Sequence, residues 1–270
     1  LESQKKFELS KEFHLKIKEY AENKGLIFLS TPHANEWSVD LLEEIGVPAY
    51  KIGSGDITNI PVLKYIAHKN KPILLSTGMS TMEDVERAVK AIREESNEQL
   101  VLLQCTNDYP CPIQDINLNV IKELKNKFNA IVGFSDHTLR VDVPSIAVAL
   151  GAKVIEKHIT LDKNLPGPDH KASLESQELK EMVKLIRETE VMLGSNEKKP
   201  TEAELNVANF ARKSLVTTRK INKGEIITRD LLTFKRPGTG IPPYEIDKII
   251  GKKAKQDLDE DILVSFKDLI

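Results

Sequence analysis

The sequence of 270 residues lacks features that would assign it to a membrane or to nucleic acid. No apolar run approaches the roughly 20 residues that a transmembrane helix needs, and no signal-peptide pattern opens the chain. The 39 basic and 41 acidic residues are interspersed and give a formal net charge of -2, so no basic face is available for nucleic acid. We therefore expect neither a membrane nor a nucleic-acid partner.

Cysteine is almost absent, which excludes a disulfide framework. The two cysteines, Cys105 and Cys111, are typical of a reducing compartment, and we expect a cytoplasmic location. We interpret Cys105 as structural, because no feature of the sequence argues for the lowered pKa that a nucleophilic thiol needs. With 40% hydrophobic and 30% charged residues, the chain has an ordinary globular composition, long enough for a large domain and a small one.

Short apolar segments alternate with amphipathic ones through the first two-thirds of the chain. Near-continuous apolar strands separated by helices indicate a parallel sheet covered by helices. The predicted strands are 26–30, 49–53, 72–76, 100–104, 130–137 and 153–158, and the predicted helices are 11–23, 36–45, 61–68, 82–95, 117–128, 143–150 and 176–193.

Six βα units are two fewer than a (β/α)8 barrel contains, and a barrel without two strands exposes two unpaired edges. Either the first two units are absent from this sequence, or the sheet is open and doubly wound. The sequence begins with Leu1 rather than Met, and the first predicted helix, 11–23, has no strand before it. We therefore predict an α/β fold, a (β/α)8 TIM barrel whose first two βα units are absent.

The composition changes after Leu193. Residues 194–200 form a polar, turn-rich stretch, and a Thr-x-x-Glu capping box at Thr201 and Glu204 predicts a short helix over 201–212. Beyond it, short strands and frequent turns indicate a mostly β module, near the smallest size at which a core is self-sufficient. The predicted domains are a barrel over 1–194, a linker over 195–211 and the β module over 212–270.

Two histidines, His137 and His158, end two consecutive predicted strands. In a (β/α)8 barrel such positions face the active site. Neutral imidazoles are the commonest protein ligands of divalent transition metals, and a pair can hold one ion while leaving positions open for substrate and water. This favours a metal-assisted carbonyl reaction with Mn²⁺ or Mg²⁺; the alternative is that each histidine merely satisfies a strand end.

A carboxylate accompanies this histidine pair. Glu156 is two residues before His158 on the same predicted strand, so both side chains point to the same face. Glu156 could act as acid or base, or support the coordination of a metal. The alternative is an ion pair with a lysine such as Lys157 or Lys51.

Hydroxyl groups end several of the predicted strands, at Thr31, Ser54, Ser76 and Ser135. Converging at one end of a barrel with glycine-exposed amides and the charge of Lys51, they would cradle a phosphate or carboxylate. Taken singly, each hydroxyl is better explained as the cap of a turn or a helix. Together they suggest an anionic substrate.

Two further segments carry groups suited to a sugar. Asn107 and Tyr109 follow the fourth predicted strand, where an aromatic ring and an amide suit a sugar face or an acyl group. Asp169 lies in the Pro-Gly-rich loop 165–170, where a carboxylate could orient a substrate hydroxyl. A solvated turn is the alternative for this loop.

Several of these motifs also carry a resemblance to a known family. They resemble the bacterial sialic acid synthases, meaning the N-acetylneuraminate synthases and their legionaminate, pseudaminate and spore-coat relatives, with a C-terminal antifreeze-like (SAF) domain. The match runs from about Leu26 to the C-terminus in family order, and it departs at the start, where the first two βα units are missing. The segments are Lys51-Ile52-Gly53-Ser54-Gly55-Asp56, Leu75-Ser76-Thr77-Gly78-Met79-Ser80, Gly133-Phe134-Ser135-Asp136-His137-Thr138, Glu156-Lys157-His158-Ile159-Thr160-Leu161-Asp162, Gly167-Pro168-Asp169-His170 and Lys235-Arg236-Pro237-Gly238-Thr239-Gly240-Ile241.

The resemblance implies an enzyme that condenses phosphoenolpyruvate with the aldehyde of an N-acylated hexosamine, such as N-acetylmannosamine, to a nine-carbon 2-keto acid and phosphate. It implies a divalent cation on His137 and His158 that polarises the aldehyde, and Glu156 as the group that manages the attacking water. The implied phosphoenolpyruvate contacts are Thr31, Lys51, Ser54, Ser76, Asn107 and Ser135, and the implied sugar contacts are Tyr109 and Asp169.

The resemblance also implies a domain-swapped homodimer, in which Arg236 of one subunit reaches the N-acyl group bound by the other. Three alternatives stay open: a legionaminate or pseudaminate synthase of the same chemistry, another metal-dependent aldol-type barrel acting on a sugar phosphate, and a non-catalytic carbohydrate-binding protein. N-acetylmannosamine and its diacetamido-trideoxy analogue differ at positions that loop details decide, so the sequence leaves the hexosamine open.

Overall fold

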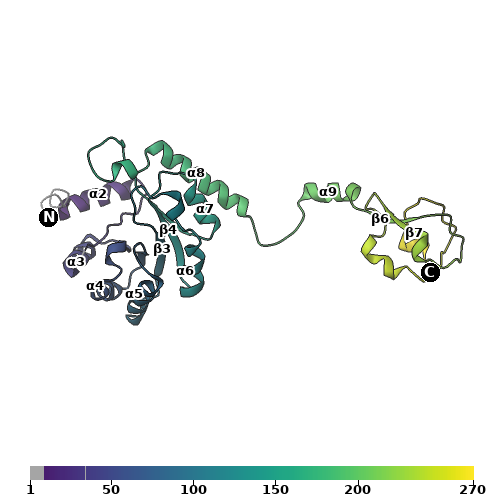
Figure 1. Ribbon diagram of the computed structural model, residues 1–270, viewed down its shortest axis with the longest axis horizontal. Coiled ribbons are helices and arrows are strands. Elements are labelled where there is room, and N and C mark those ends of the chain that lie inside the picture. Colours follow the sequence, from purple (N-terminus) through teal and green to yellow (C-terminus); the bar gives the residue numbers. More distant parts are fainter. Residues whose placement is uncertain (1–8, 34) are drawn as a thin grey trace. The chain divides into compact units, whose positions relative to one another are not determined.

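The computed structural model describes residues 9–33 and 35–270, and it contains two compact units, residues 1–194 and 195–270. Figure 1 shows the helices and strands of each unit, and each unit has a buried core of its own. In the described part of the chain, no helix is both long and apolar enough to span a membrane.

The first unit is an alternation of strands and helices around one parallel sheet. Its five strands lie in the order β1-β2-β3-β4-β5, so each strand pairs with the next along the chain. The sheet is a half-barrel, which places the unit in the predicted (β/α)8 class. The elements are α2 (Lys11–Asn23), α3 (Glu36–Ile45), β1 (Tyr50–Ile52), α4 (Ile60–Ala67), β2 (Ile73–Ser76), α5 (Met82–Glu94), β3 (Leu100–Cys105), α6 (Val120–Phe128), β4 (Ile131–Asp136), α7 (Val143–Ala149), β5 (Val154–Lys157) and α8 (Ser176–Leu193).

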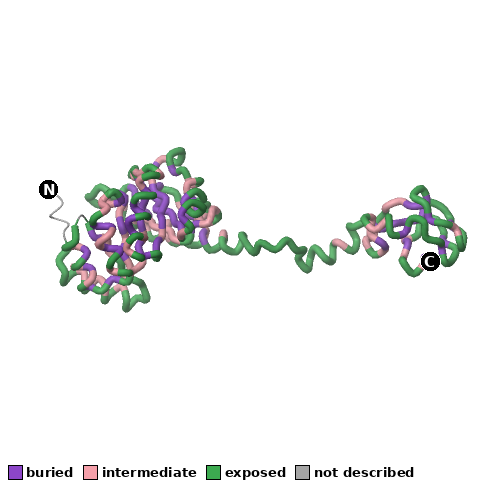
Figure 2. The backbone as a smooth tube through the Cα atoms, turned by 90° about the horizontal axis from the view of Figure 1, so that it is seen from below, coloured by how far each residue is buried: buried purple, intermediate pink, exposed green. Residues whose placement is uncertain are grey.

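The core lies between the sheet and the helices that cover its outer face. Figure 2 shows the buried residues concentrated in the centre of the first unit. Helix α5 illustrates how the sequence builds this layer, because Val85, Ala88, Val89 and Ile92 are spaced to lie on one face and are all buried. A capping box begins this helix: the Thr81 hydroxyl accepts from the backbone N–H of Asp84, whose carboxylate accepts from the N–H of Thr81.

The strand predicted at residues 26–30 is not formed, so the described residues form a sheet of five strands rather than six. Leu26 and Ile27 are 63% and 80% exposed, and only Phe28 packs against the core. An apolar composition predicted the strand, but a strand also needs a hydrogen-bonded neighbour. Within the described residues, β1 pairs with β2 and has no ladder with this segment.

The helix predicted over 117–128 begins later, at Val120. Asn117 has a φ of 48°, in the left-handed region, which an α-helix cannot contain. The three residues before Val120 therefore form a turn, in which the N–H of Val120 donates to the Asn117 carbonyl. The other predicted helices, and the five strands that form, agree with the structure to within one residue at each end.

The second unit contains helix α9 (Glu202–Ala211) and an antiparallel pair, β6 (Ser214–Thr217) with β7 (Leu232–Lys235). The capping box expected at Thr201 and Glu204 is present. Helix α9 lies in the predicted linker, yet its C-terminal end contacts the β module, since the N–H of Gly238 donates to the carbonyl of Asn209. The module has a core of its own, which includes Leu215, Ile221, Ile227, Ile249 and Val264.

Candidate active site

Polar side chains gather at the carboxyl ends of the five parallel strands. Alternation along each strand sends every second side chain to the inner face of the half-barrel, where Lys51, Ser135 and Glu156 point. The loops that follow the strands add more polar groups at the same end. The gathered residues are Lys51, Ser54, Ser76, Cys105, Asn107, Tyr109, Ser135, Glu156, His137 and His158.

The strongest geometric feature of the site is a contact between its first and last strands. Lys51 of β1 and Glu156 of β5 are separated by four steps of the sheet, which in a flat sheet would span roughly 19 Å. Instead, the Lys51 Nζ lies 3.4 Å from Glu156 Oε2. The sheet therefore curls enough to bring its two ends together, as a barrel requires.

This contact extends into a short polar network. Lys51 Nζ also donates to Ser76 Oγ at 2.9 Å, and the Ser135 hydroxyl donates to Glu156 Oε1 at 2.7 Å. Each oxygen of Glu156 thus has one partner. Of the two ion pairs considered for Glu156, the one with Lys51 is formed, whereas Lys157 pairs with Asp136 on the other face of the sheet.

The two histidines lie side by side under an aromatic ring. The ring centroids of His137 and His158 are 5.3 Å apart, and the Tyr109 ring lies 4.1 Å from His137 and 5.5 Å from His158. Burial raises the pKa of Tyr109 to about 12, with further contributions from the nearby Cys105, Asp169 and Glu156. Tyr109 is therefore a neutral phenol at physiological pH.

The hydrogen bonds of His137 leave the lone pair of one nitrogen available to a ligand. Nδ1 lies 2.7 Å from the carbonyl oxygen of Thr106, which can only accept, so Nδ1 carries the proton and Nε2 the lone pair. The Ser135 hydroxyl is 3.5 Å from Nε2, but it donates its proton to the closer Glu156. Burial lowers the pKa of His137, while the bond to Thr106 opposes that shift. A neutral imidazole held by a backbone carbonyl is the usual form of a metal-binding histidine.

The donor set fits a divalent cation held by two imidazoles, with its other positions supplied by water or substrate. In residues 9–33 and 35–270 no cluster of three or more histidine, cysteine or acidic side chains has the geometry of a complete metal site. His137 and His158 are thus the candidate ligands, and Glu156 is adjacent but held by Lys51 and Ser135. Catalytic metal sites typically keep such open positions.

A tight group of small polar residues lies beside Lys51. Ser54 is buried, and its hydroxyl accepts from the backbone N–H of Gly78 at 3.1 Å. A Cβ on Gly78 would lie 2.3 Å from Asn107 Oδ1 and 2.8 Å from Ser54 Oγ, so no larger residue fits without displacing them. Gly78 was not predicted as a site residue from the sequence, although it lies within the Ser-Thr-Gly-Met motif.

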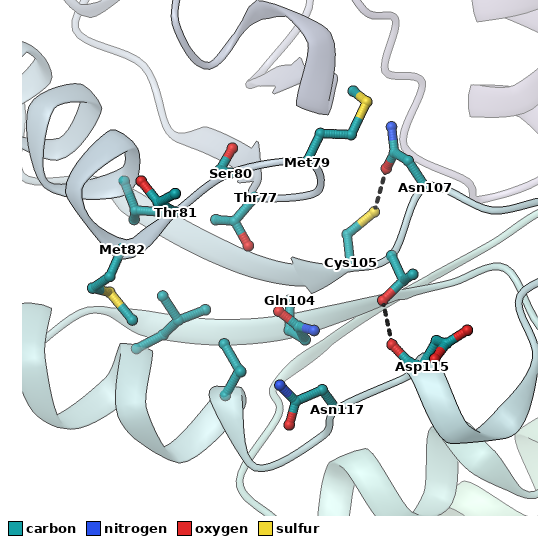
Figure 3. Close-up of a pocket in the computed structure, with 14 residues that line it drawn as sticks. Thr77, Met79, Ser80, Thr81, Met82, Gln104, Cys105, Asn107, Asp115 and Asn117 are labelled. Atoms are coloured by element: carbon teal, nitrogen blue, oxygen red, sulfur yellow. Dashed lines mark hydrogen bonds between the residues drawn. The ribbon is translucent and has the colours of Figure 1, made fainter.

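Cys105 lies at the centre of the site rather than at its periphery. Its Sγ is 3.1 Å from Asn107 Oδ1 (Figure 3). It is also 3.6 Å from Ser54 Oγ and 3.9 Å from His137 Nδ1. Burial is the main cause that raises the pKa of this thiol, which therefore stays protonated. A protonated, buried thiol agrees with the structural role expected for Cys105.

A cavity of about 620 Å³ opens beside Cys105 and Asn107, between the loops that follow β2 and β3 (Figure 3). Met79, Gln104 and Asn117 contribute to its lining, whereas the two histidines and Glu156 do not. The cavity therefore adjoins the candidate site without containing the histidine pair.

Three expected site residues are not part of this network. Thr31 is half-buried in the segment before α3, and Asp169 is exposed in its loop, close enough to influence the pKa of Tyr109. Arg236 belongs to the second unit, where its Nε–H donates to the carbonyl of Ala211. All the gathered residues belong to the first unit.

A half-barrel with this polar edge defines a (β/α)8 enzyme of the synthase type. The NeuB family matches residues 1–198 and the SAF domain matches residues 212–270. The chain therefore belongs to the NeuB family, which confirms the resemblance seen in its motifs.

The relatives whose names give a product differ in the sugar acid that is named. An uncharacterized protein of Methanocaldococcus jannaschii is 48% identical, over 98% of this chain and 79% of its own. The N,N'-diacetyllegionaminic acid synthase of Legionella pneumophila is 44% identical, over 94% of this chain and 72% of its own. The solved N-acetylneuraminic acid synthetase of Leptospira borgpetersenii is 34% identical with a TM-score of 0.70, over 74% of this chain and 70% of its own.

Proposed function

We propose that the protein condenses phosphoenolpyruvate with the open-chain aldehyde of an N-acylated hexosamine, giving a nine-carbon 2-keto acid and inorganic phosphate. The observation that supports this most is the Lys51–Glu156 contact beside the paired imidazoles of His137 and His158. This arrangement combines a lysine for an anionic substrate, a carboxylate for proton transfer and two imidazole ligands for a metal ion. All of them lie at the carboxyl ends of the strands. The names of the relatives support the same class of reaction.

Phosphoenolpyruvate would bind at the lysine side of the site. The Lys51 side chain is 14% exposed and already hydrogen-bonded to Ser76, so it is held in place before an anion arrives. Ser54, Asn107 and Ser135 add hydroxyl and amide groups around it. Thr31 is proposed as a further contact.

The reaction proceeds by attack of the enolpyruvate methylene carbon on the aldehyde carbon, which forms the new C–C bond. Water then adds to the resulting oxocarbenium carbon, and phosphate leaves by cleavage of its C–O bond. We propose that Glu156 accepts the proton of that water, because its carboxylate lies on the inner face beside Lys51, where phosphoenolpyruvate would bind. The Ser135 hydroxyl orients the carboxylate through their hydrogen bond.

His137 and His158 would hold a divalent cation, Mn²⁺ or Mg²⁺. Such an ion, when bound, supplies a Lewis acid that polarises the aldehyde oxygen. Tyr109 packs against both imidazoles and limits their movement. We propose that Tyr109 and Asp169 contact the sugar, and that Arg236 reaches the N-acyl group from a partner subunit in a domain-swapped homodimer.

The choice between sugars needs a direct assay. Phosphate release from phosphoenolpyruvate is measured with N-acetylmannosamine and with its diacetamido-trideoxy analogue, each with Mn²⁺. The higher identity to the legionaminic acid synthase, 44% against 34%, leads us to expect the higher kcat/KM with the analogue. Release with neither sugar, together with calorimetric sugar binding that needs no phosphoenolpyruvate, would instead support a carbohydrate-binding protein.

An aldol-type enzyme acting on a sugar phosphate is the other alternative. The SAF domain match argues against it. A reaction that proceeds without phosphoenolpyruvate would establish it.

A further inference from the structure

A buried ion pair lies on the outer face of β4 and β5, directly behind the candidate site. Asp136 and Lys157 are paired in the register of the two strands, and Lys157 Nζ lies 2.6 Å from Asp136 Oδ2. The side chain of Lys157 is 2% exposed and that of Asp136 is 0% exposed. Among the ion pairs formed within residues 9–33 and 35–270, no other has both side chains buried to this extent; the pair of Lys51 with Glu156, for example, is 14% and 34% exposed.

The pair connects the two chain neighbours of His137 to strand β5. The Thr138 N–H donates to Asp136 Oδ1 at 2.9 Å, and the Thr138 hydroxyl donates to Asp136 Oδ2 at 3.3 Å. Lys157 Nζ donates to the carbonyl of Thr138 as well as to Asp136. His137 is therefore enclosed between two residues that are bonded to each other and to Lys157.

The same lysine stands between Glu156 and His158 in the chain. One register step before the ion pair, Ser135 faces Glu156 on the inner side of the sheet. In the sequence, His137 directly follows Asp136 and His158 directly follows Lys157. In the described sheet, β5 has β4 as its one neighbour, so the β4–β5 register sets where the end of β5 lies.

Fold stability does not by itself account for a buried ion pair. Removing two charges from water costs about as much as their attraction returns, and an apolar pair of similar volume is often as stable. Directional hydrogen bonds, in contrast, form in a single register, and a slip by one residue would turn every side chain to the other face. Such a slip would separate the site residues.

We propose that Asp136 and Lys157 are positioning residues, which hold His137, Glu156 and His158 at the separation that the reaction needs. The proposal rests on the proposed function, since it assumes that the two histidines bind a cation. It assigns these two residues no contact with substrate or metal.

The test measures Mn²⁺ binding rather than activity. The Asp136→Asn/Lys157→Met double variant removes both charges, while the amide oxygen that replaces the carboxylate can still accept from Thr138. We expect this variant to be folded by circular dichroism. Its dissociation constant for Mn²⁺, measured from the electron paramagnetic resonance signal of free Mn²⁺, should rise at least about tenfold. A second, isosteric variant, Thr138→Val, removes the hydroxyl that donates to Asp136 and accepts from the backbone N–H of Arg140, and it should raise the constant about threefold.

A control separates positioning from general destabilisation. Val132 is buried at the other end of β4, and Val132→Ala should lower the melting temperature while leaving Mn²⁺ affinity within about twofold of the wild type. Unchanged Mn²⁺ affinity in the folded double variant, or in Thr138→Val if the double variant is unfolded, overturns the positioning role. An equal loss of affinity in Val132→Ala overturns it as well.

The proposed function fails in a different way. If the wild-type protein binds no Mn²⁺, or if His137→Ala binds it as well as the wild type does, the histidine pair is not the metal site, and the positioning proposal falls with it. If the wild type binds and His137→Ala does not, the metal site stands, and the variants above decide the role of the ion pair alone.

Discussion

At the scale of single residues, the hydrogen bonds around the site decide which atoms are left to act. The Thr106 carbonyl occupies Nδ1 of His137 and leaves the lone pair on Nε2, and Lys51 and Ser135 hold the two oxygens of Glu156. Cys105 lies among these groups but stays protonated because it is buried. The site is thus arranged before any substrate binds, which is the form that lowers the cost of binding and reaction.

Loss of one imidazole should abolish metal-dependent turnover. We expect His137→Ala to reduce phosphate release at least about a hundredfold, because a single histidine cannot hold the cation at working concentrations. The wild type should lose activity in EDTA and regain it with Mn²⁺. His68 is an exposed histidine that pairs with Glu95, and His68→Ala serves as the control with unchanged kinetics. Full activity of His137→Ala in the presence of EDTA would contradict the metal role.

Gly78 should be intolerant of a methyl group. In Gly78→Ala the new Cβ would collide with Asn107 Oδ1 and Ser54 Oγ, so both groups must shift away from the anion site. We expect the KM for phosphoenolpyruvate to rise about tenfold, with a smaller change in the KM for the sugar. The matched control is Gly55→Ala, since a Cβ at Gly55 meets nothing within 4 Å. Equal KM values for phosphoenolpyruvate in the two variants would show that the close approach at Gly78 has no part in binding.

At the scale of elements, the sequence predicts what depends on local pattern. Continuous apolar runs between amphipathic helices predicted the parallel sheet, and His137, His158 and Glu156 were placed correctly at the ends of β4 and β5 because the apolar runs stop there. The period of two along a strand predicted which of these side chains share a face. For the ion pair of Glu156, the sequence left Lys51 and Lys157 as possible partners. Which of them pairs with Glu156 depends on how far the sheet curls. The strand expected at 26–30 was wrong for a similar reason: its formation depends on a neighbour, and no local pattern reports one.

The start of α6 depends on one backbone conformation. Asn117 is in the left-handed region, which asparagine tolerates better than residues with longer or branched side chains. We expect Asn117→Ala to lower the free energy of unfolding by about 1 kcal/mol and Asn117→Gly to leave it nearly unchanged. Urea unfolding followed by circular dichroism measures both. Equal losses for the alanine and glycine variants would mean that the Asn117 side chain, rather than its backbone, stabilises this turn.

At the scale of the whole molecule, the chain divides its work between two units with separate cores. The first unit gathers the polar site from five strands, and the second builds its own core from residues such as Leu215 and Ile249. Arg236 is fixed within the second unit, since its Nε–H donates to the carbonyl of Ala211 at the end of α9. A role for Arg236 in the reaction therefore requires that a second unit, of the same or of a partner subunit, dock over the candidate active site of a first unit.

The proposed docking can be tested with two inactive proteins. If Arg236 reaches the N-acyl group from a partner subunit, Arg236→Ala should lose most turnover while remaining folded and binding phosphoenolpyruvate normally. Mixing it with His137→Ala under subunit exchange should restore about a quarter of wild-type activity, because half of the dimers become mixed and each holds one intact site. If Arg236 instead served the site of its own chain, every site in the mixed dimer would lack either Arg236 or His137. No recovery despite demonstrated exchange would therefore reject the shared site, and normal kinetics of Arg236→Ala alone would reject any role for this arginine in sugar binding.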